Sequence, residues 1–373
     1  MKENKYKVEL QRLIDPSDVK LDGSRPWDVH LHDFDACRRI ISQGSLGLGE
    51  TYTEGLWDCE KLDEFMFRIL RSGVRENFEY NWTTLKTYLQ SKIFNLQNLK
   101  RAKKVVERHY DLGNKLYLSF LDPYNQYTCG YFKDTDDLNV SQIKKLELIC
   151  NKLQLKSTDK VLDIGCGWGG FAKFASERFG CHVTGITISD EQYKYAQDFT
   201  KGLPVSIQKK DYRYISGKFN KILVCGMIEH VGYKNYRNIF EIVNKSLAED
   251  GLFLLHTIST KASVTGPDPW IHKYIFPNGM APSLQQLARA SDKLFILEDL
   301  HNFGAYYDQT LMAWFKNFDQ NWPLIKHDFD ETFYRMWKYY LLTCAGMFRA
   351  RETELWQLVF SKYGIIGGYG AIR

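Results

Sequence analysis

The stretch VLDIGCGWGG, residues 161–170, decides how the rest of the chain is interpreted. It starts as an apolar run, continues with an aspartate, and ends with glycines at 165, 167, 169 and 170. Glycine is placed where a backbone must turn sharply or let a ligand come close. A strand that runs into such a loop therefore predicts either a ligand site or a purely structural turn.

Strands and helices alternate outward from this stretch. Strand-like apolar runs lie at 160–164, 182–188, 205–211, 221–226 and 251–258, and helical spacing recurs at 169–179, 189–199 and 234–250. This alternation predicts an α/β fold with a doubly wound parallel sheet, which the strand-like runs at 294–300 and 355–361 could complete. Ligands of such sheets bind at the carboxyl ends of the strands, so the position of the glycine loop favours a ligand. The long segment 261–283 is typical of a lid or binding loop.

The spacing of the glycines distinguishes between ligand classes. A dinucleotide fingerprint needs GxGxxG and an acidic residue about 20 positions later, but the spacing here is G-x-G-x-G-G and the next strand offers Thr187 and Ser189. No Lys-Ser/Thr pair follows the glycines, which excludes a P-loop. The pattern DxGxGxG, which begins at Asp163, is instead the signature of S-adenosylmethionine-dependent methyltransferases.

The region before the sheet has a different pattern. Apolar residues at helical spacing in 62–74 and 82–96 predict a small helical domain over 1–95. We interpret GSLGLGE, residues 44–50, as a turn between helices, because no clear strand precedes it. A basic linker, 96–108, separates this domain from a catalytic domain over 109–373. The basic stretch is either a solvated surface or a region attracted to anionic membranes, at about 1 kcal/mol per cation.

Composition limits the class of protein. The chain has 373 residues, a formal net charge of +5 and 15% aromatic residues, and that charge is too small to imply nucleic acid. The eight cysteines show neither CxxC pairs nor zinc spacing, so we expect reduced thiols and no metal site. The first residues lack the apolar core of a signal peptide, and no run is long enough to span a bilayer. We therefore expect a cytoplasmic protein with peripheral membrane contact.

The chain resembles the cyclopropane-fatty-acyl-phospholipid synthases almost from end to end. The matching stretches include QGSLGLGETY (43–52), HYDLGNKLY (109–117), DPYNQYTCGYF (122–132), GMIEHVG (226–232), KYIFPNG (273–279), HNFGAYYDQTLMAW (301–314) and CAGMFRAR (344–351). The match at GSLGLGE favours the phospholipid-acting members, because the related mycolic-acid enzymes lack that region. The resemblance implies a seven-stranded Rossmann-like methyltransferase sheet, a small helical N-terminal domain and a homodimer.

The resemblance also implies a reaction. Members of the family use S-adenosylmethionine to insert a methylene into the cis double bond of an unsaturated phospholipid acyl chain. An alkene is a poor nucleophile, so the methyl donor must be held close and aligned. Methyl transfer leaves a carbocation on the chain, and a bicarbonate ion bound to the protein removes a proton from the new methyl so that the ring closes.

The resemblance implies which residues of this sequence would form the bicarbonate site. Its residues are Cys129, Glu229, His256, Ile258 and Tyr307. Taken singly, each has an ordinary structural explanation, such as a buried thiol or a core histidine, and only the joint match favours a site. Histidine and tyrosine can donate hydrogen bonds to an anion, and glutamate can accept one from its hydroxyl.

The implied cofactor residues follow the strand ends. Tyr110 and Tyr127 are expected around the sulfonium, where an aromatic face suits a cation. Thr128 stands where the family often has serine. The full cofactor set is Tyr110, Tyr127, Thr128, Asp163, Gly165, Gly167 and Gly169 for the methionine part, Thr187 and Gln192 for the ribose, and Asp211 and Tyr212 for the adenine.

Two other functions remain open at this point. A methyltransferase that adds a saturated or exomethylene branch to the same lipid would share the loop and the pocket. A lipid-binding scaffold with an inactive methyltransferase fold would bind the cofactor without turnover, but the intact glycines and anion-site residues argue against it. Cys344, sometimes treated as a nucleophile in this family, is expected to be structural, because the chemistry needs no covalent intermediate.

Overall fold

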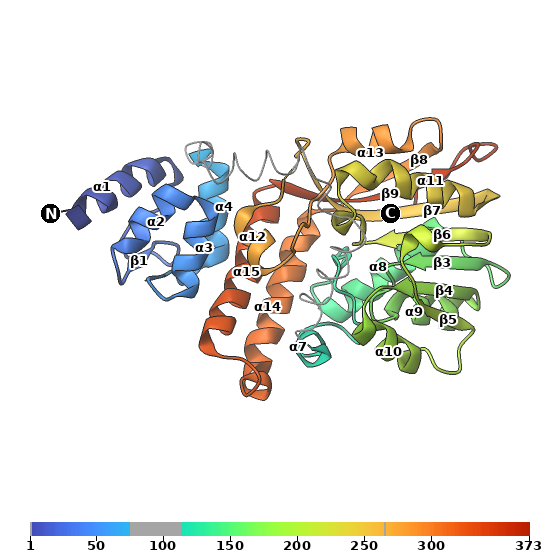
Figure 1. The fold of residues 1–373 in the computed structure, drawn as a ribbon, viewed down its shortest axis with the longest axis horizontal. Coiled ribbons are helices and arrows are strands. Elements are labelled where there is room, and N and C mark those ends of the chain that lie inside the picture. The colour runs from blue at the N-terminus through green and yellow to red at the C-terminus, as the bar shows by residue number, and fades with distance from the viewer. Residues whose placement is uncertain (1, 75–112, 265) are drawn as a thin grey trace. The chain divides into compact units, whose positions relative to one another are not determined.

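The computed structural model describes residues 2–74, 113–264 and 266–373. The chain divides into two compact units (Figure 1). The helical unit contains Met1–Asn95, Thr265–Pro277 and Leu311–Thr353, and the sheet unit contains Leu96–Val264, Asn278–Thr310 and Glu354–Arg373. The helical unit therefore includes segments from late in the chain, whereas the domain boundaries expected from sequence, 1–95, 96–108 and 109–373, remain predictions.

The helical unit is built from short helices and a two-stranded sheet. Its elements in chain order are α1 (Lys2–Ile14), a 3-10 turn (Asp15–Ser17), β1 (His30–Leu31), α2 (Asp35–Gln43), α3 (Ser45–Thr53), β2 (Trp57–Asp58), α4 (Leu62–Arg71), α12 (Pro269–Tyr274), the later part of α14 (Ala305–Ile325) and α15 (Glu331–Arg349). The helix predicted over 62–74 is confirmed by α4. The stretch 82–96 and the basic linker lie outside the described residues.

GSLGLGE is helical, so its interpretation as a turn was wrong. Only Gly44, with φ of 58°, makes the turn between α2 and α3, and α3 begins at Ser45. A Cβ at Gly47 would lie 2.3 Å from the backbone oxygen of Arg39, and one at Gly49 would lie 2.3 Å from the ring of Trp270. The glycines therefore allow α3 to pack closely against α2 and α12, despite the low helix propensity of glycine.

The sheet unit alternates strands and helices. Its elements are α7 (Asn114–Leu118), α8 (Leu138–Lys152), β3 (Lys160–Ile164), α9 (Gly170–Phe179), β4 (His182–Thr187), α10 (Asp190–Phe199), β5 (Val205–Lys209), β6 (Phe219–Cys225), α11 (Tyr236–Ser246), β7 (Leu247–Thr260), α13 (Leu284–Ser291), β8 (Ile296–Asn302) and β9 (Thr353–Ser361), with 3-10 turns at Tyr212–Tyr214, Ile228–His230 and Tyr233–Asn235. The helix predicted over 234–250 ends at Ser246, because Leu247 is already extended and pairs with Phe219.

The seven strands have the order β5-β4-β3-β6-β7-β9-β8. The pairs β4–β5, β3–β4, β3–β6 and β6–β7 are parallel, and β8 pairs antiparallel with β9. The α/β fold with a doubly wound, mostly parallel sheet is thus confirmed. Because the first five strands of this order run in one direction, their carboxyl ends share one edge.

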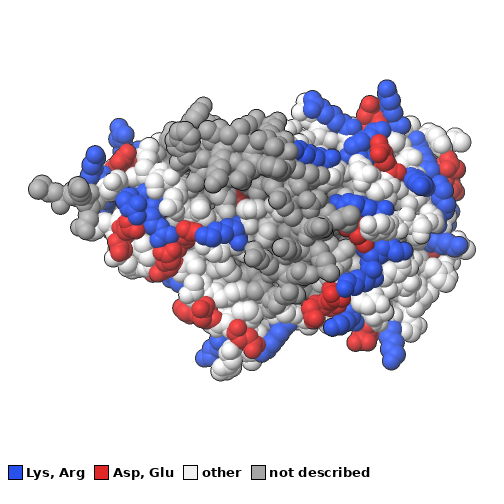
Figure 2. Space-filling model, in the orientation of Figure 1, with Lys and Arg blue, Asp and Glu red and all other residues white. Residues whose placement is uncertain are grey.

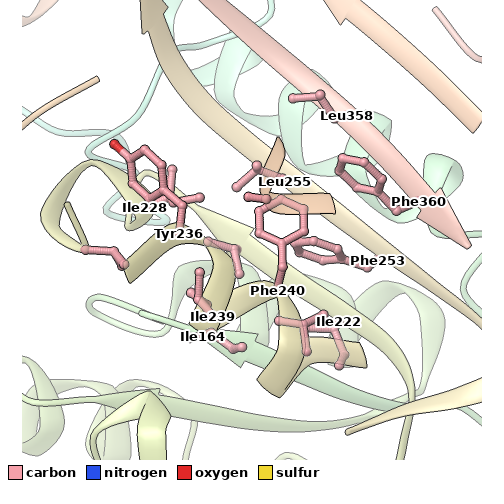
Figure 3. Close-up of a cluster of buried hydrophobic side chains, with 14 of the residues drawn as sticks. Ile164, Ile222, Ile228, Tyr236, Ile239, Phe240, Phe253, Leu255, Leu358 and Phe360 are labelled. Atoms are coloured by element: carbon pink, nitrogen blue, oxygen red, sulfur yellow. The ribbon is translucent and has the colours of Figure 1, made fainter. Parts of the chain in front are cut away.

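Alternate residues of each strand face opposite sides of the sheet. On one side, Leu162, Ile222 and Phe253 pack against α11 and α13, and Phe240 of α11 lies between Ile222, Phe253 and Phe360 (Figure 3). On the other side, Val161 and Leu223 pack against Leu146 of α8 and residues of α9. Burial on both faces holds the sheet as a rigid platform for the loops at its edge.

Candidate active site

The glycine loop joins β3 to α9. Gly165, Gly167 and Gly169 have φ values of 84°, 54° and 83°, which residues with a Cβ rarely adopt. A Cβ at Gly165 would lie 2.7 Å from Cγ of Met227, whereas a Cβ at Gly167 would meet no atom of the described residues within 4 Å. The backbone at Gly167 therefore faces open space at the carboxyl edge of the sheet, and a ligand could approach it there.

The segment 122–130 packs directly against this loop. A Cβ at Gly170 would lie 1.7 Å from the backbone oxygen of Tyr124, and a Cβ at Gly226, just after β6, would lie 2.8 Å from Cγ2 of Thr128. The ring of Tyr127 contacts Tyr117 edge-on at 5.2 Å, and Tyr117 contacts Trp168 of the glycine loop at 5.0 Å. Tyr127 and Thr128 thus lie beside the ends of β3 and β6, while Tyr110 is outside the described residues.

Glu229 lies in the 3-10 turn after β6 and is buried. Its Oε1 accepts a 2.7 Å hydrogen bond from the backbone N–H of Ile258, near the end of β7. Its Oε2 is buried and has no hydrogen-bond partner among the described residues. Burial raises the pKa of this carboxyl to about 7, since a low-dielectric site disfavours the charged form.

His256 lies on β7 beside Cys225 of β6 and is fully buried. Its Nδ1 is 3.3 Å from Nε2 of Gln357 on β9. Burial lowers the pKa of the imidazole well below its usual value, so the ring is neutral. With the Gln357 amide in this orientation, its nitrogen donates to Nδ1, and this arrangement corresponds to the tautomer with the ring proton on Nε2. That Nε2 has no partner among the described residues.

These two buried atoms, which have no partner among the described residues, complement each other. Glu229, in the turn after β6, supplies an acceptor, and His256, on β7 beside the last residue of β6, supplies a donor. Buried polar atoms are nearly always hydrogen-bonded in proteins, so each such exception needs an explanation. A small oxyanion that carries a hydroxyl could satisfy both atoms.

The segment that carries Cys129 contacts α14, the helix on which Tyr307 lies. The backbone N–H of Gly130 donates to Oγ1 of Thr310 at 3.0 Å, and Sγ of Cys129 is 3.9 Å from the same atom. Tyr307 is buried one turn earlier on α14. Burial raises the pKa of the Cys129 thiol, so the residue is a neutral thiol and a poor nucleophile.

The remaining predicted cofactor residues lie at the ends of β4 and β5. Oγ1 of Thr187 donates to Oε1 of Gln192 at 3.0 Å. Asp211 caps the turn after β5 and forms a 2.9 Å ion pair with Arg213, while Tyr212 is buried beside it. Along β5-β4-β3-β6-β7, the predicted adenine, ribose, methionine and anion residues therefore follow one another in order.

Two further residues were raised by the sequence: Asp163, which was predicted to bind the cofactor, is buried, and Cys344, which was expected to be structural, is partly buried. Asp163 lies within β3, and burial raises the pKa of its carboxyl to about 7 while Lys145 acts in the opposite direction. Cys344 is in the helical unit, where burial and nearby Asp268 raise the pKa of its thiol to about 12. This pKa supports the interpretation of Cys344 as a structural cysteine.

Three further buried polar residues, Gln126, Lys145 and Gln357, were not predicted from sequence. Lys145 and Gln357 interrupt apolar patterns, and that mismatch is their sequence signal, whereas Gln126 lies in the stretch PYNQYT, which has no such pattern. Gln357 lies inside the apolar run of β9 and sets the tautomer of His256. Gln126 and Lys145 bond to each other.

The chain is similar to known proteins over most of its length. A family model described as mycolic acid cyclopropane synthetase matches residues 97–358. The chain is 46% identical over 371 residues to a cyclopropane-fatty-acyl-phospholipid synthase of Escherichia coli, covering 100% of this chain and 97% of the relative. It is 32% identical to a probable fatty acid methyltransferase of Pseudomonas putida, covering 69% of each chain.

The fold agrees with that of solved structures. A mycolic acid cyclopropane synthase, CmaA1, solved in complex with SAH and CTAB, superposes with a TM-score of 0.65 at 27% identity. The superposition covers 70% of this chain and 98% of that structure.

Proposed function

We propose that this chain, which belongs to the mycolic acid cyclopropane synthetase family, converts the cis double bond of an unsaturated phospholipid acyl chain into a cyclopropane ring. S-adenosylmethionine is its methyl donor, as in the methyltransferases it resembles. The proposal rests on two observations at the same edge, both made among the described residues. The glycine loop is open at Gly167, and two buried polar atoms nearby, Glu229 Oε2 and His256 Nε2, have no hydrogen-bond partner.

The residues at the edge suit the cofactor. Gly165, Gly167 and Gly169 let its methionine part approach the backbone, and the open space at Gly167 provides the room. Thr187 and Gln192 would meet its ribose, and Asp211 and Tyr212 its adenine. The rings of Tyr110 and Tyr127 would face the sulfonium. When bound, S-adenosylmethionine supplies an electrophilic methyl group.

The residues at the ends of β6 and β7 suit a bicarbonate ion. Neutral His256 would donate from Nε2, and Glu229 as a carboxylate would accept the hydroxyl of the ion through Oε2. Tyr307 would donate a further hydrogen bond, and the Ile258 and Cys129 segments would complete the walls. These residues would orient the base that takes a proton from the new methyl, in a site that excludes water.

A methyltransferase that leaves a branch rather than a ring is the second candidate. It is favoured by the similarity to the Pseudomonas putida protein, whose name is that of a probable fatty acid methyltransferase. The two candidates share the cofactor loop and differ in where the proton is lost. The structure of the acyl product distinguishes them.

Gly167→Val should abolish measurable binding of S-adenosylhomocysteine. The new side chain would occupy the open space that the cofactor needs, and its backbone would be strained at a φ of 54°. Gly202→Val is the matched control, because Gly202 also has positive φ and open surroundings but lies on the loop between α10 and β5. Isothermal calorimetry on both variants is the measurement; unchanged affinity in Gly167→Val would refute the cofactor assignment.

We also propose peripheral contact with anionic membranes, a cytoplasmic location and a homodimer. Within the described ranges, each helix is too short or too polar to cross a bilayer. Figure 2 shows Lys and Arg interspersed with Asp and Glu on the described surface in view. We therefore assign the attraction to the basic stretch 99–108, which is outside the described residues.

Binding to vesicles that contain anionic phospholipid should weaken as salt rises. Exposed charges more than about 10 Å apart are screened at 0.1 M salt. Flotation of the full chain with anionic and zwitterionic vesicles measures this. If no vesicle recruits the chain at any ionic strength, the substrate must reach the site by another route.

A further inference from the structure

Lys145 places a buried ammonium group beneath the segment 122–130. The side chain extends from α8 and is fully buried. Its Nζ donates hydrogen bonds to Oε1 of Gln126 and, at 3.0 Å, to Oγ1 of Thr128. Removing an ammonium from water is costly unless its donors are satisfied, and both of these acceptors are neutral. If the site were purely structural, an apolar residue could fill it without this desolvation cost.

The two acceptors flank a residue of the proposed cofactor site. Gln126 and Thr128 lie on either side of Tyr127, and Cys129 follows. The backbone oxygen of Thr128 also accepts a 2.8 Å hydrogen bond from Gln142, another residue of α8. Helix α8 therefore holds this segment through side chains that reach both sides of Tyr127.

The segment is held between α8 and the strand ends. Positions Gly170 and Gly226 have no room for a Cβ because Tyr124 and Thr128 lie against them. Any shift of Gln126 or Thr128 would therefore move the segment relative to the glycine loop and to the end of β6. Such a shift would displace Tyr127 and Cys129 together.

We infer that Lys145 is a positioning residue for methyl transfer, which holds the Gln126–Cys129 segment against the ends of β3 and β6 so that the ring of Tyr127 faces the cofactor. The inference rests on the proposed function. Its effect passes through Gln126 and Thr128 rather than through contact with the reacting atoms.

The electrostatic surroundings of Lys145 support this role. Burial lowers the pKa of its ammonium group, while the nearby carboxyl groups of Asp122 and Asp163 act to raise it. Asp122 in turn accepts a 2.7 Å hydrogen bond from the backbone N–H of Gln126. The cation and this carboxylate thus act on the same segment.

Lys152 provides a matched control. It lies seven residues later on α8 and is also fully buried, but it is paired with Asp299 of β8 at 3.2 Å. Lys145→Met and Lys152→Met therefore each remove one buried ammonium from the same helix. Both should lower the melting temperature, and only the first should change the cofactor site.

The experiment measures affinity for S-adenosylhomocysteine by calorimetry, and kcat and KM, in the full chain. We expect Lys145→Met to weaken binding about tenfold or more and to lower kcat/KM by about 10²-fold, the scale reported for misplacing a group by about 1 Å. Lys152→Met should bind like the wild type. Equal affinities in the two variants would overturn the inference. Failure of the wild type to bind would instead refute the proposed function.

Variants at Gln126 keep the inference testable if Lys145→Met does not fold, because Gln126 is the other acceptor for Lys145 and is not among the proposed cofactor residues. Gln126→Met removes the acceptor and should weaken binding, whereas Gln126→Glu keeps an acceptor for Lys145 and should bind more like the wild type. Where Lys145→Met folds, the double variant with Gln126→Met should lose less than the sum of the two single losses, because the two residues act as one unit. Additive losses, or equal binding by the Met and Glu variants, would overturn the inference.

Discussion

Glu229→Gln should lose ring formation by about 10²- to 10⁴-fold, the usual scale for removing acid–base help, while its affinity for S-adenosylhomocysteine stays near that of the wild type. The substitution keeps the shape of the side chain, and an acceptor for the N–H of Ile258 at Oε1. It can replace Oε2, which has no described partner, with an NH2 group. That group cannot accept the hydroxyl of bicarbonate.

Glu241→Gln is the control for this prediction. Glu241 is exposed on α11 and pairs only at the surface with Arg237, at 2.9 Å, so its loss should leave the rate unchanged. The measurement is the initial rate of product formation together with calorimetry. Full activity of Glu229→Gln would remove the support for an oriented anion.

The pH profile provides a second readout for the same residue. Burial raises the pKa of Glu229 to about 7, and the proposed role needs the carboxylate. At constant bicarbonate concentration, the wild-type rate should therefore fall as pH drops below about 7. His256 stays neutral there, because burial holds the pKa of its imidazole well below the usual value.

Removal of bicarbonate should have the other large effect. In carbonate-depleted buffer the wild-type rate should fall sharply and recover when bicarbonate is added, because no protein side chain is assigned as the base. His256→Ala removes the Nε2 donor and should lose about 10²- to 10⁴-fold at any bicarbonate concentration. Tyr307→Phe deletes one donor and keeps the ring, so added bicarbonate should partly restore its rate.

The comparison is the initial rate against bicarbonate concentration for the wild type and both variants. A wild-type rate that ignores depletion, together with full activity of His256→Ala, would contradict the bicarbonate mechanism. The fold and the cofactor assignment would survive that result, and a side chain would then have to be sought as the base.

Much of the sheet could be predicted because its signal is local. Residues such as Leu162 and Leu223 are buried on opposite faces of the sheet, so the strands that carry them are apolar runs. Each such run can be recognised from its own few residues. The helix at GSLGLGE could not be predicted in this way. Glycine is needed at positions 47 and 49 because Arg39 and Trp270 leave no room for a Cβ there. Trp270 lies more than 200 residues away in the chain, so local sequence does not show this contact.

The candidate site, like the fold, could be predicted only in part from local sequence. Glu229 could be placed at the ligand edge because it follows a strand that is readable from sequence. His256 lies inside β7, which continues to Thr260, but it is beside Cys225, the last residue of β6. Their roles came from family resemblance. The pairing of His256 with Gln357 spans 101 residues. No local pattern shows that Glu229 Oε2 and His256 Nε2 have no partner among the described residues.

The most direct test of the central proposal is the structure of the lipid product. The full chain is incubated with S-adenosylmethionine, bicarbonate and vesicles of unsaturated phospholipid, and the acyl chains are examined by mass spectrometry and proton NMR. We predict a gain of one CH2 per converted chain, loss of the olefinic protons and appearance of ring protons. A gain of CH2 with olefinic protons retained would indicate an exomethylene branch. That result, or an unchanged lipid beside a bound cofactor, would contradict the proposal.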